Sequence, residues 1–280
     1  MENMSKHELT FTTLGLLGPA GSGKDLVADW FVETQNYVKV AFADPMKRFV
    51  MRTFNLTWEQ LWGPSSERNR EFEVEDAWWF EVIGHFGSGS YELVNAVLDE
   101  GVRTVGFLKL HDWLTALRRD YRNKISTRVI LQTLGTEWGR AVDPLMWAKY
   151  TYKTVEEVSN GHFYTQIGGV RQRRPGEVST YAGAVIPDHR FVNEIEMTQT
   201  RGGYVTRLRR LANEPKDDGN VGIQGHATEH EMRSIPDSTF DLVLELEEGI
   251  DKVHDALEKV VRGANGPAWE AKRWTDKSPS

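Results

Sequence analysis

The sequence GPAGSGKD, at residues 18–25, has the Gly-x-x-x-x-Gly-Lys spacing of a phosphate-binding loop. The apolar run from Phe11 to Leu17 precedes it and predicts a β-strand, and the apolar residues after Lys24 recur at helical spacing. The motif requires this strand–loop–helix context, because glycines let several backbone N–H groups point at one phosphate and the start of the helix adds positive potential. A glycine-rich turn without a ligand is the alternative, and the flanking elements argue against it.

Two side chains at the end of this loop carry the expected chemistry. Lys24 would reach the β- and γ-phosphates of ATP and offset the charge that shifts during phosphoryl transfer. The Ser or Thr that usually follows the lysine is replaced by Asp25. A carboxylate there can hold Mg²⁺, because hard cations take oxygen ligands, or it can simply cap the helix. Both interpretations of Asp25 stay open.

The chain beyond the loop continues to alternate between strand and helix patterns. Residues 38–42 predict a second strand, and Asp44-Pro45 then starts a helix with Asp44 as N-cap and Pro45 in the first helical position. Because strands that alternate with helices form parallel sheets, the sequence predicts an α/β fold with a parallel sheet flanked by helices. Further strands are predicted at 184–186, 204–208 and 240–244, and further helices at 127–140, from 143, from 193 and over 250–261.

Two segments depart from this alternation. Residues 58–123 are rich in Trp, Glu and Gly, and their pattern does not assign their elements. Residues 161–183 have the turn residues and the alternation of a hairpin with a basic tip. The stretch after Gly263 predicts a loosely ordered tail.

Composition limits the function further. The 280 residues suffice for one or two domains, and the formal net charge of −7 argues against a surface that coats a nucleic-acid polymer. The absence of Cys excludes disulfides, thiolate nucleophiles and Cys-based zinc sites, and it fits a reducing compartment. No signal peptide or membrane-spanning stretch is evident, so we expect a cytoplasmic protein with no membrane or nucleic-acid polymer as partner.

A second candidate group lies on the predicted helix 127–140. Arg128 and Gln132 are one turn apart and share a face with Gly135. A guanidinium can bind a phosphate with two hydrogen bonds, an amide can pair with the edge of a base, and a glycine lets a flat ring approach the backbone. Trp147 on the next helix could supply a stacking face. Spacing alone favours the alternative, an ordinary amphipathic helix with a solvated Arg and a core Trp.

Asp188 follows the short strand 184–186, where the second acidic residue of such folds orients Mg²⁺ or accepts a proton. An Asp at the end of a strand is often only a turn former. The upstream phosphate loop strengthens the functional interpretation, because ligand sites in doubly wound sheets lie at the carboxyl ends of the strands. Arg190 and Glu194 follow closely.

Several basic residues leave alternatives open. Lys47 and Arg48 predict a solvated face unless their helix borders the cleft. The arginines within 171–174 and 207–210 are solvated, or one of them closes over ATP.

His226 and His230 lie one helical turn apart, which is a possible zinc spacing. No third ligand is evident, and Thr228 and Glu231 have the spacing of a capping box. The sequence therefore favours a structural helix start over a metal site.

Six blocks of this sequence together resemble the bacteriophage deoxynucleoside monophosphate kinases. They fall in the order of that family and span most of the chain: GSGKD-x-x-AD at 21–29, ADPMK at 43–47, R-x-x-LQ-x-LGTE at 128–137, D-x-LMWAK at 143–149, PD-x-RF-x-NE at 187–194 and H-x-TE at 226–229. Each block alone is weak, whereas the ordered set is specific. Asp25, unusual for phosphate loops in general, is the normal residue of that family. Leu26 and Val27 depart from it, because they replace hydroxyl residues sometimes found there.

The resemblance implies a fold and a division of the chain. The fold would be a P-loop kinase core of residues 9–57 and 124–263, with an inserted, mostly helical monophosphate-binding region at 58–123 and a loose tail at 264–280. A homodimer is a further expectation from the resemblance.

The resemblance also implies a site. It assigns ATP to Ala20, Gly21, Ser22, Gly23, Lys24 and Asp25, with Arg210 approaching it and Asp25 near Mg²⁺. It assigns the acceptor nucleotide to Lys47, Arg128, Gly135, Thr136, Trp147, Asp188, Arg190 and Glu194, and we add Gln132 from its place on the face of Arg128. The catalytic residues would be Lys24, Asp25, Asp188 and Arg190.

The function expected from the resemblance is transfer of the γ-phosphate of ATP to a deoxynucleoside monophosphate, which supplies nucleotides for DNA synthesis. If the protein is viral, it would act in the host cytoplasm. One alternative is a related kinase acting on a modified nucleotide or on dephospho-coenzyme A. Another is a P-loop ATPase that has no acceptor substrate.

Overall fold

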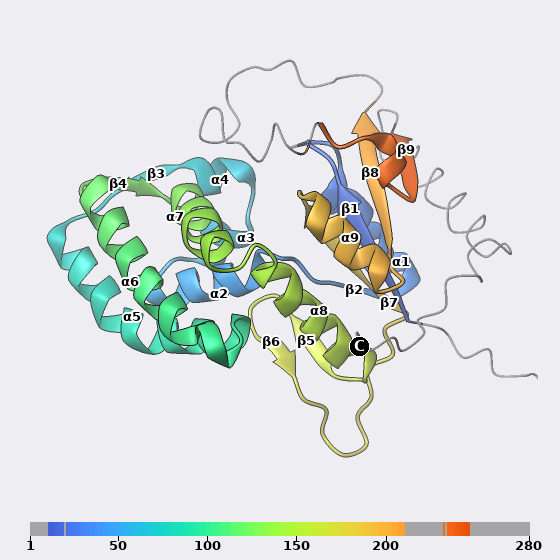
Figure 1. Ribbon diagram of the computed structural model, residues 1–280, viewed down its shortest axis with the longest axis horizontal. Helices are drawn as coiled ribbons and strands as arrows, with labels where there is room; N and C mark the ends of the chain where they lie inside the picture. The colour runs from blue at the N-terminus through green and yellow to red at the C-terminus, as the bar shows by residue number, and fades with distance from the viewer. Residues whose placement is uncertain (1–10, 20, 211–231, 233, 247–280) are drawn as a thin grey trace, which may run out of the picture.

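A five-stranded parallel sheet forms the centre of the molecule in the computed structural model, which describes residues 11–19, 21–210, 232 and 234–246 (Figure 1). Its strand order is β2-β7-β1-β8-β9, and every neighbouring pair is parallel, which confirms the predicted sheet. The strands are β1 (Thr12–Leu17), β2 (Tyr37–Lys39), β7 (Gly183–His189), β8 (Tyr204–Arg210) and β9 (Leu242–Leu246).

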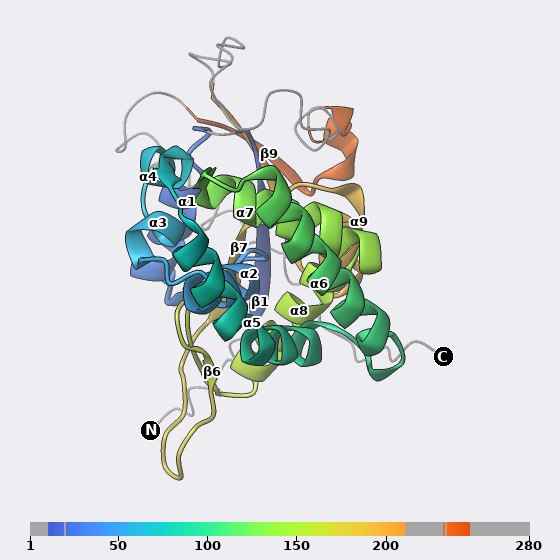
Figure 2. The same cartoon turned by 90° about the vertical axis from the view of Figure 1, so that its left-hand side faces the viewer.

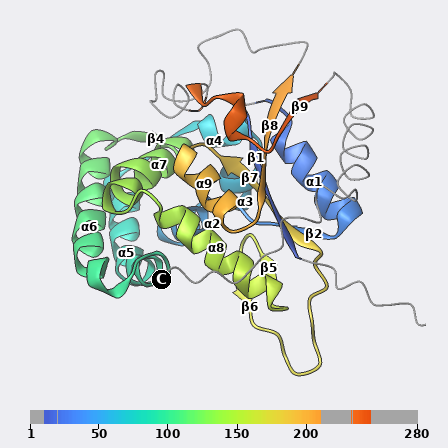
Figure 3. The same cartoon turned by 45° about the vertical axis from the view of Figure 1, so that its right-hand side comes forward.

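Helices cover both faces of the sheet, because β1 is apolar on both sides. Leu14 and Leu16 pack against Trp30 of α1 (Lys24–Gln35). Leu17 belongs to the opposite layer, where it packs with Ile195 of α9 (Val192–Thr200). Figure 3 shows α1 and α9 on opposite sides of the strands.

Most of the remaining described chain forms a helical region beside the sheet, on the left in Figure 1 and toward the viewer in Figure 2. Its elements are α2 (Asp44–Thr53), α3 (Trp58–Trp62), α4 (Ser65–Asn69), β3 (Glu71–Glu73), α5 (Asp76–Val97), η1 (Glu100–Val102), α6 (Arg103–Asp120), β4 (Lys124–Ser126), α7 (Thr127–Thr133), η2 (Leu134–Arg140) and α8 (Met146–Ser159). The region implied to be an insertion is therefore mostly helical. Strand β3 pairs with β4, so one small antiparallel sheet joins the two sides of the expected boundary at residue 123.

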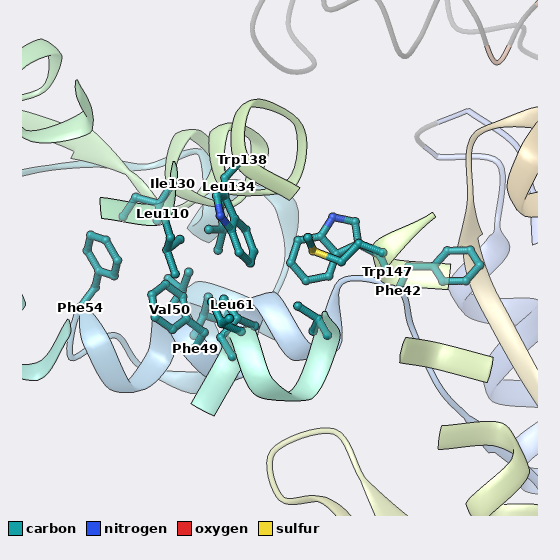
Figure 4. Packing of buried hydrophobic residues seen from close by; sticks show 14 of the residues in the cluster. Phe42, Phe49, Val50, Phe54, Leu61, Leu110, Ile130, Leu134, Trp138 and Trp147 are labelled. Atoms are coloured by element: carbon teal, nitrogen blue, oxygen red, sulfur yellow. The ribbon is translucent and has the colours of Figure 1, made fainter. Parts of the chain in front are cut away.

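The helical region has its own large core, in which aromatic residues are prominent. Trp79 and Trp138 are fully buried in it, together with Phe54, which directly follows α2. Figure 4 shows Leu134 and Trp138 pointing from η2 toward Phe49 and Val50 of α2. No helix in the described ranges is both long and apolar enough to cross a membrane.

Helix α5 lies in the segment 58–123, and its two faces differ in composition. Its buried side chains recur every three or four residues, at positions 79, 82, 86, 90, 93 and 97. Gly84 and Gly87 lie on its open side, where nothing approaches within 4 Å of an added Cβ. These glycines lower the helix propensity of the segment. The helix is stabilised instead by burial of its other face.

The structure corrects three details of the expected elements. Residues 127–140 are one α-helix only as far as Thr133, and Leu134–Arg140 is a π-helix. The N-cap of α2 is Ala43, and the Asp44 carboxylate accepts the N–H of Ala41 instead. The predicted hairpin exists as β5 (Phe163–Thr165) and β6 (Gly169–Arg171), so Arg171 ends the second strand and Arg173 and Arg174 follow it, instead of forming the tip.

Strand β7 is longer than expected, because it continues through Pro187 to His189. Along the ladder with β1, Gly15 pairs with Ile186, and the next pair is Leu17 with His189, so β7 has one more unpaired residue than β1 between these two pairs. Pro187, which has no N–H to donate, therefore lies at an irregularity of the ladder. The predicted helix 250–261, the pair His226 and His230, and the tail lie outside the described residues.

His189 is buried between the sheet and two helices. Its Nε2 lies 2.7 Å from the Thr198 hydroxyl, which also accepts a hydrogen bond from Tyr152 of α8. Nδ1 lies 3.3 Å from the carbonyl oxygen of Ile186. Burial lowers the pKa of His189 to about 4, because no carboxylate offsets the loss of hydration of the charged ring.

This burial predicts a pH dependence of stability. A depressed folded-state pKa means that the unfolded chain binds a proton as pH falls below about 6.5 while the folded protein does not, so the wild type loses stability between pH 6.5 and 4. We expect the stability difference between the wild type and His189→Gln to shrink by about 2–3 kcal/mol between pH 7.5 and 4.5, measured by urea unfolding. The same substitution at exposed His85 serves as the control; a pH-independent difference for His189→Gln would contradict the expectation.

Candidate functional site

The glycine-rich loop between β1 and α1 has the geometry that its sequence predicts. Gly21 and Gly23 have φ values of 77° and 91°, in the left-handed region that glycine adopts without strain. Lys24 Nζ donates to the carbonyl oxygens of Gly18 at 2.6 Å and Pro19 at 2.8 Å. The lysine thus lies over its own loop, beside the N-terminus of α1.

Asp25 lies in the first turn of α1, whereas Gly23 is the N-cap. Its side chain is 81% exposed and lies 3.3 Å from Lys39 Nζ, which also binds Asp29. The carboxylate is thus exposed and paired with Lys39, and the magnesium contact stays a prediction. No cluster of three metal-ligating side chains occurs in the described part of the chain.

Asp188 anchors the turn that leads from β2 into α2. Its two oxygens accept the backbone N–H groups of Phe42 at 2.9 Å and Ala43 at 3.0 Å. Burial raises the pKa of Asp188, and the nearby Asp44 adds to this shift, while the two N–H groups oppose it. The strand-end carboxylate therefore fixes the start of α2 beside the glycine-rich loop.

Lys47, one turn into α2, is half-buried rather than solvated. Burial lowers the pKa of its ammonium; Arg68 lowers it further, whereas Asp44, Asp188 and Asp25 act in the opposite direction. Among the described residues it has no hydrogen bond or ion pair, and Nζ instead lies 5.4 Å from the centre of the Trp62 ring. Lys47 therefore does not lie on a solvated face, and its role at the site stays a prediction.

Arg68 on α4 lies near Asp25 and Arg190, although no motif of the sequence includes it. Burial lowers the pKa of its guanidinium, Asp25 opposes this shift, and Arg190 lowers the pKa further. Arg68, Arg190 and the P-loop carboxylate are therefore close enough to interact electrostatically. The run SSERNRE around Arg68 matches no motif, so the sequence alone does not indicate that Arg68 lies near these residues.

The predicted face of α7 and η2 points toward α2 and α4. Arg128 Nη1 donates to Asn69 Oδ1 at 3.2 Å, next to Arg68. A Cβ on Gly135 would lie 3.2 Å from the sulfur of Met46. Between them, Gln132 Oε1 is buried and has no hydrogen-bond partner within the described ranges. A buried acceptor without a donor is costly unless a ligand supplies one.

Trp147 and Thr136 have structural contacts in this arrangement. Trp147 is 4% exposed, and its indole N–H donates to the carbonyl of Gly135 at 3.1 Å. Its ring leaves no room for a side chain at Gly139. Thr136 donates to the carbonyl of Gln132. Trp147 therefore occupies the core, as spacing alone favoured, and supports the backbone at Gly135.

Glu194 holds the segment that carries Arg190. Its Oε2 accepts the backbone N–H groups of Arg190 at 2.8 Å and Phe191 at 3.2 Å, at the start of α9. Burial raises the pKa of Glu194 to about 7, and Arg140 of η2, 3.7 Å away, works against this shift. The Arg140 guanidinium also lies over the Phe191 ring, at 3.3 Å.

Three of the other candidate arginines have ionic partners in the structure. Arg207 and Arg209 both bind Asp237, and Arg171 binds Glu177. The side chain of Arg210 and the residue Ala20 lie outside the described part of the chain.

A parallel sheet with a glycine-rich loop after its central strand, and cationic side chains gathered beside that loop, defines an α/β fold of the P-loop kinase class. The comparisons with known proteins then narrow this class. The family model described as deoxynucleotide monophosphate kinase matches residues 13–186. The chain belongs to this kinase family.

A viral relative supports the same assignment. A protein of Acanthamoeba polyphaga mimivirus, named "Putative deoxynucleotide monophosphate kinase", is 23% identical over 253 residues. The match covers 90% of this chain and 97% of that protein, so it includes both the sheet and the helical region.

The contact between Arg140 and Glu194 predicts a non-additive effect on stability. Arg140→Met leaves Glu194 buried without its cation, so we expect a loss of about 2 kcal/mol in the free energy of unfolding. Glu194→Gln should recover part of this loss when it is combined with Arg140→Met. Urea unfolding of the two single variants and the double variant measures the coupling, and strictly additive losses would show that the pair contributes nothing.

Proposed function

We propose that the protein transfers the γ-phosphoryl group of ATP to the phosphate of a deoxynucleoside monophosphate, giving the diphosphate. The observation that carries this proposal is the half-buried Lys47 ammonium, which has no hydrogen bond or ion pair among the described residues. It shares its surroundings with Arg68, Asp188 and Asp25, and thus lies next to the phosphate loop. The nearby carboxylates make no direct ion pair with this ammonium, and an acceptor phosphate would supply one.

The donor half of the site is the loop from Ala20 to Asp25, with Arg210 as the expected arginine near ATP. Lys24 would exchange the carbonyls of Gly18 and Pro19 for phosphate oxygens, which form stronger, charge-assisted hydrogen bonds. Mg²⁺, when bound, would neutralise charge on the phosphates, and the exposed Asp25 carboxylate fits a hard cation.

The acceptor half combines cations for the phosphate with polar groups for the nucleoside. Lys47, Arg68, Arg128 and Arg190 would bind the phosphate, whereas the unpartnered Gln132 oxygen would accept a hydrogen bond from the base. Gly135 and Thr136 would border the base, with Trp147 behind them. Glu194 would not touch the nucleotide; it would hold the backbone of Arg190 in place.

The chemistry needs no strong base, because the acceptor phosphate is already ionised at neutral pH. Catalysis would rest on in-line positioning and on charge neutralisation by Lys24 and the arginines. Asp188 would position the start of α2 through the N–H groups of Phe42 and Ala43. Closure of the helical region over the sheet would exclude water and prevent hydrolysis of ATP.

The same proposal covers the biological setting. The enzyme would supply deoxynucleotides for DNA synthesis in the cytoplasm, or in the host cytoplasm if it is viral. A homodimer remains an expectation of the family resemblance.

A coupled assay for ADP release tests the proposal directly. ATP, Mg²⁺ and each common deoxy- and ribonucleoside monophosphate are supplied in turn. Stimulation by one or a few monophosphates is the expected result and defines base and sugar preference. ADP release that is equal with and without every acceptor would overturn the kinase proposal in favour of an ATPase.

Lys24→Met tests the donor half. We expect kcat to fall by about a hundredfold or more, because the main cation on the transferring phosphates is lost. Lys153→Met, an exposed lysine on α8, is the matched control. Normal turnover by a folded Lys24→Met variant would remove the loop lysine from the mechanism.

Arg128→Ala and Arg68→Ala test the acceptor half. Each should raise the KM for the monophosphate about tenfold to a hundredfold, the cost of one lost charged hydrogen bond, and leave the KM for ATP nearly unchanged. Arg119→Ala, on the surface of α6, should change neither constant. An unchanged acceptor KM would exclude the substituted arginine from the site.

A further inference from the structure

Trp62, the last residue of α3, is the direct contact of the Lys47 ammonium. The ring centre lies 5.4 Å from Lys47 Nζ, within the range of a cation–π interaction. Trp62 is half-buried and lies in the segment 58–123, outside every block that carries the family resemblance. Its contact therefore adds a feature that the motifs of the chain did not indicate.

A buried carboxylate fixes the orientation of the Trp62 ring. The indole N–H donates to Asp44 Oδ1 at 3.0 Å. Asp44 is fully buried and accepts two more hydrogen bonds on Oδ2, from the N–H of Ala41 at 2.9 Å and the hydroxyl of Tyr164 at 2.6 Å. Burial and the Asp44 charge raise the pKa of Tyr164, so its hydroxyl keeps the proton that it donates.

Arg48 extends this network into two further segments. Its guanidinium donates to the hydroxyl of Tyr150 on α8 at 2.8 Å and to the carbonyl of Gln166 in the hairpin turn at 2.9 Å, and it lies 3.4 Å from the Tyr164 hydroxyl. The ring of Trp62 is thus fixed from α2, α8 and the hairpin together. Networks in which every polar group is satisfied are rigid, so the ring has one defined position.

The side chain of Lys47, in contrast to the Trp62 ring, is intrinsically flexible. A lysine ammonium ends a flexible four-carbon chain, and ordering such a chain costs conformational entropy. Because the ring face meets Lys47 before any ligand arrives, part of this ordering is already achieved in the free protein.

We propose that Trp62 is a positioning residue of the acceptor site, which holds the Lys47 ammonium where the acceptor phosphate binds. This inference rests on the proposed function of Lys47. It adds that the position of α3, through the Trp62 ring, affects how tightly the acceptor phosphate binds. Loss of the ring acts on acceptor binding and leaves ATP binding alone.

Steady-state kinetics of four variants test the proposal. Trp62→Leu is expected to raise the KM for the monophosphate about three- to tenfold, the size of a cation–π contact, with the KM for ATP unchanged. Trp62→Phe keeps a ring and should retain most of the wild-type affinity. In combination with Lys47→Met, Trp62→Leu should cause no further rise. Trp58→Leu, at an exposed tryptophan of the same helix, is the matched control.

Three outcomes would overturn the proposal: an unchanged acceptor KM in Trp62→Leu, an equal rise with and without Lys47, or a parallel rise in the KM for ATP, which a merely structural role predicts. If Trp62→Leu does not fold, Trp62→Met fills more of the space and replaces it.

An NMR measurement separates this proposal from the proposed function. The ε-methylene protons of Lys47 in the ligand-free protein should show an upfield ring-current shift that disappears in Trp62→Leu. A signal that Trp62→Leu does not change overturns the positioning role. Failure of every monophosphate to stimulate ADP release would instead overturn the proposed function.

Discussion

Two carboxylates accept three consecutive backbone N–H groups in the turn between β2 and α2. The position of the helical region relative to the sheet depends on these three hydrogen bonds. Asp188, at the end of β7, accepts the N–H groups of Phe42 and Ala43, while Asp44 accepts that of Ala41. Buried N–H groups need acceptors, so this turn has one stable arrangement. It sets the direction of α2, and through α2 the places of Lys47 and Arg48.

The parts of the fold that are set locally could be predicted from the sequence. The glycine-rich loop requires left-handed residues at Gly21 and Gly23, and only a strand before and a helix after it satisfy the spacing. The apolar strands of a sheet that is covered on both faces are also recognisable one by one. Helix α5 has a regular period of buried positions as well, at Trp79, Val82, Phe86, Ser90, Leu93, Val94 and Val97, but Ser90 on the buried face and the glycines on the open face weaken its apolar pattern.

The site could be predicted only in part, because burial is a property of the whole fold. Trp147 and Trp62 are the same residue type, yet the first occupies the core and the second is half-buried beside the Lys47 ammonium. Arg68 belongs to no motif, and its place near Asp25 and Arg190 depends on where the fold puts α4. The change from α-helix to π-helix at Leu134 depends on packing as well; π-helical turns are rare and often occur at functional sites, and this one contains Gly135.

The small sheet of β3 and β4 has a consequence for how such proteins can vary. It closes the chain at residues 71 and 126, so α5 and α6 form a closed excursion on a two-stranded stem. The two helices of the excursion are also packed into the core that contains α2 and η2: Phe86 of α5 lies against Phe49, and the Trp138 indole donates to the carbonyl of Gly106 in α6. Changes within α5 or α6 would therefore reach the elements that carry Lys47 and Gly135. The exposed connection η1 between the two helices is different, because the entropy of closing a loop changes only slowly with its length, so it is the part of the excursion best suited to divergence between relatives.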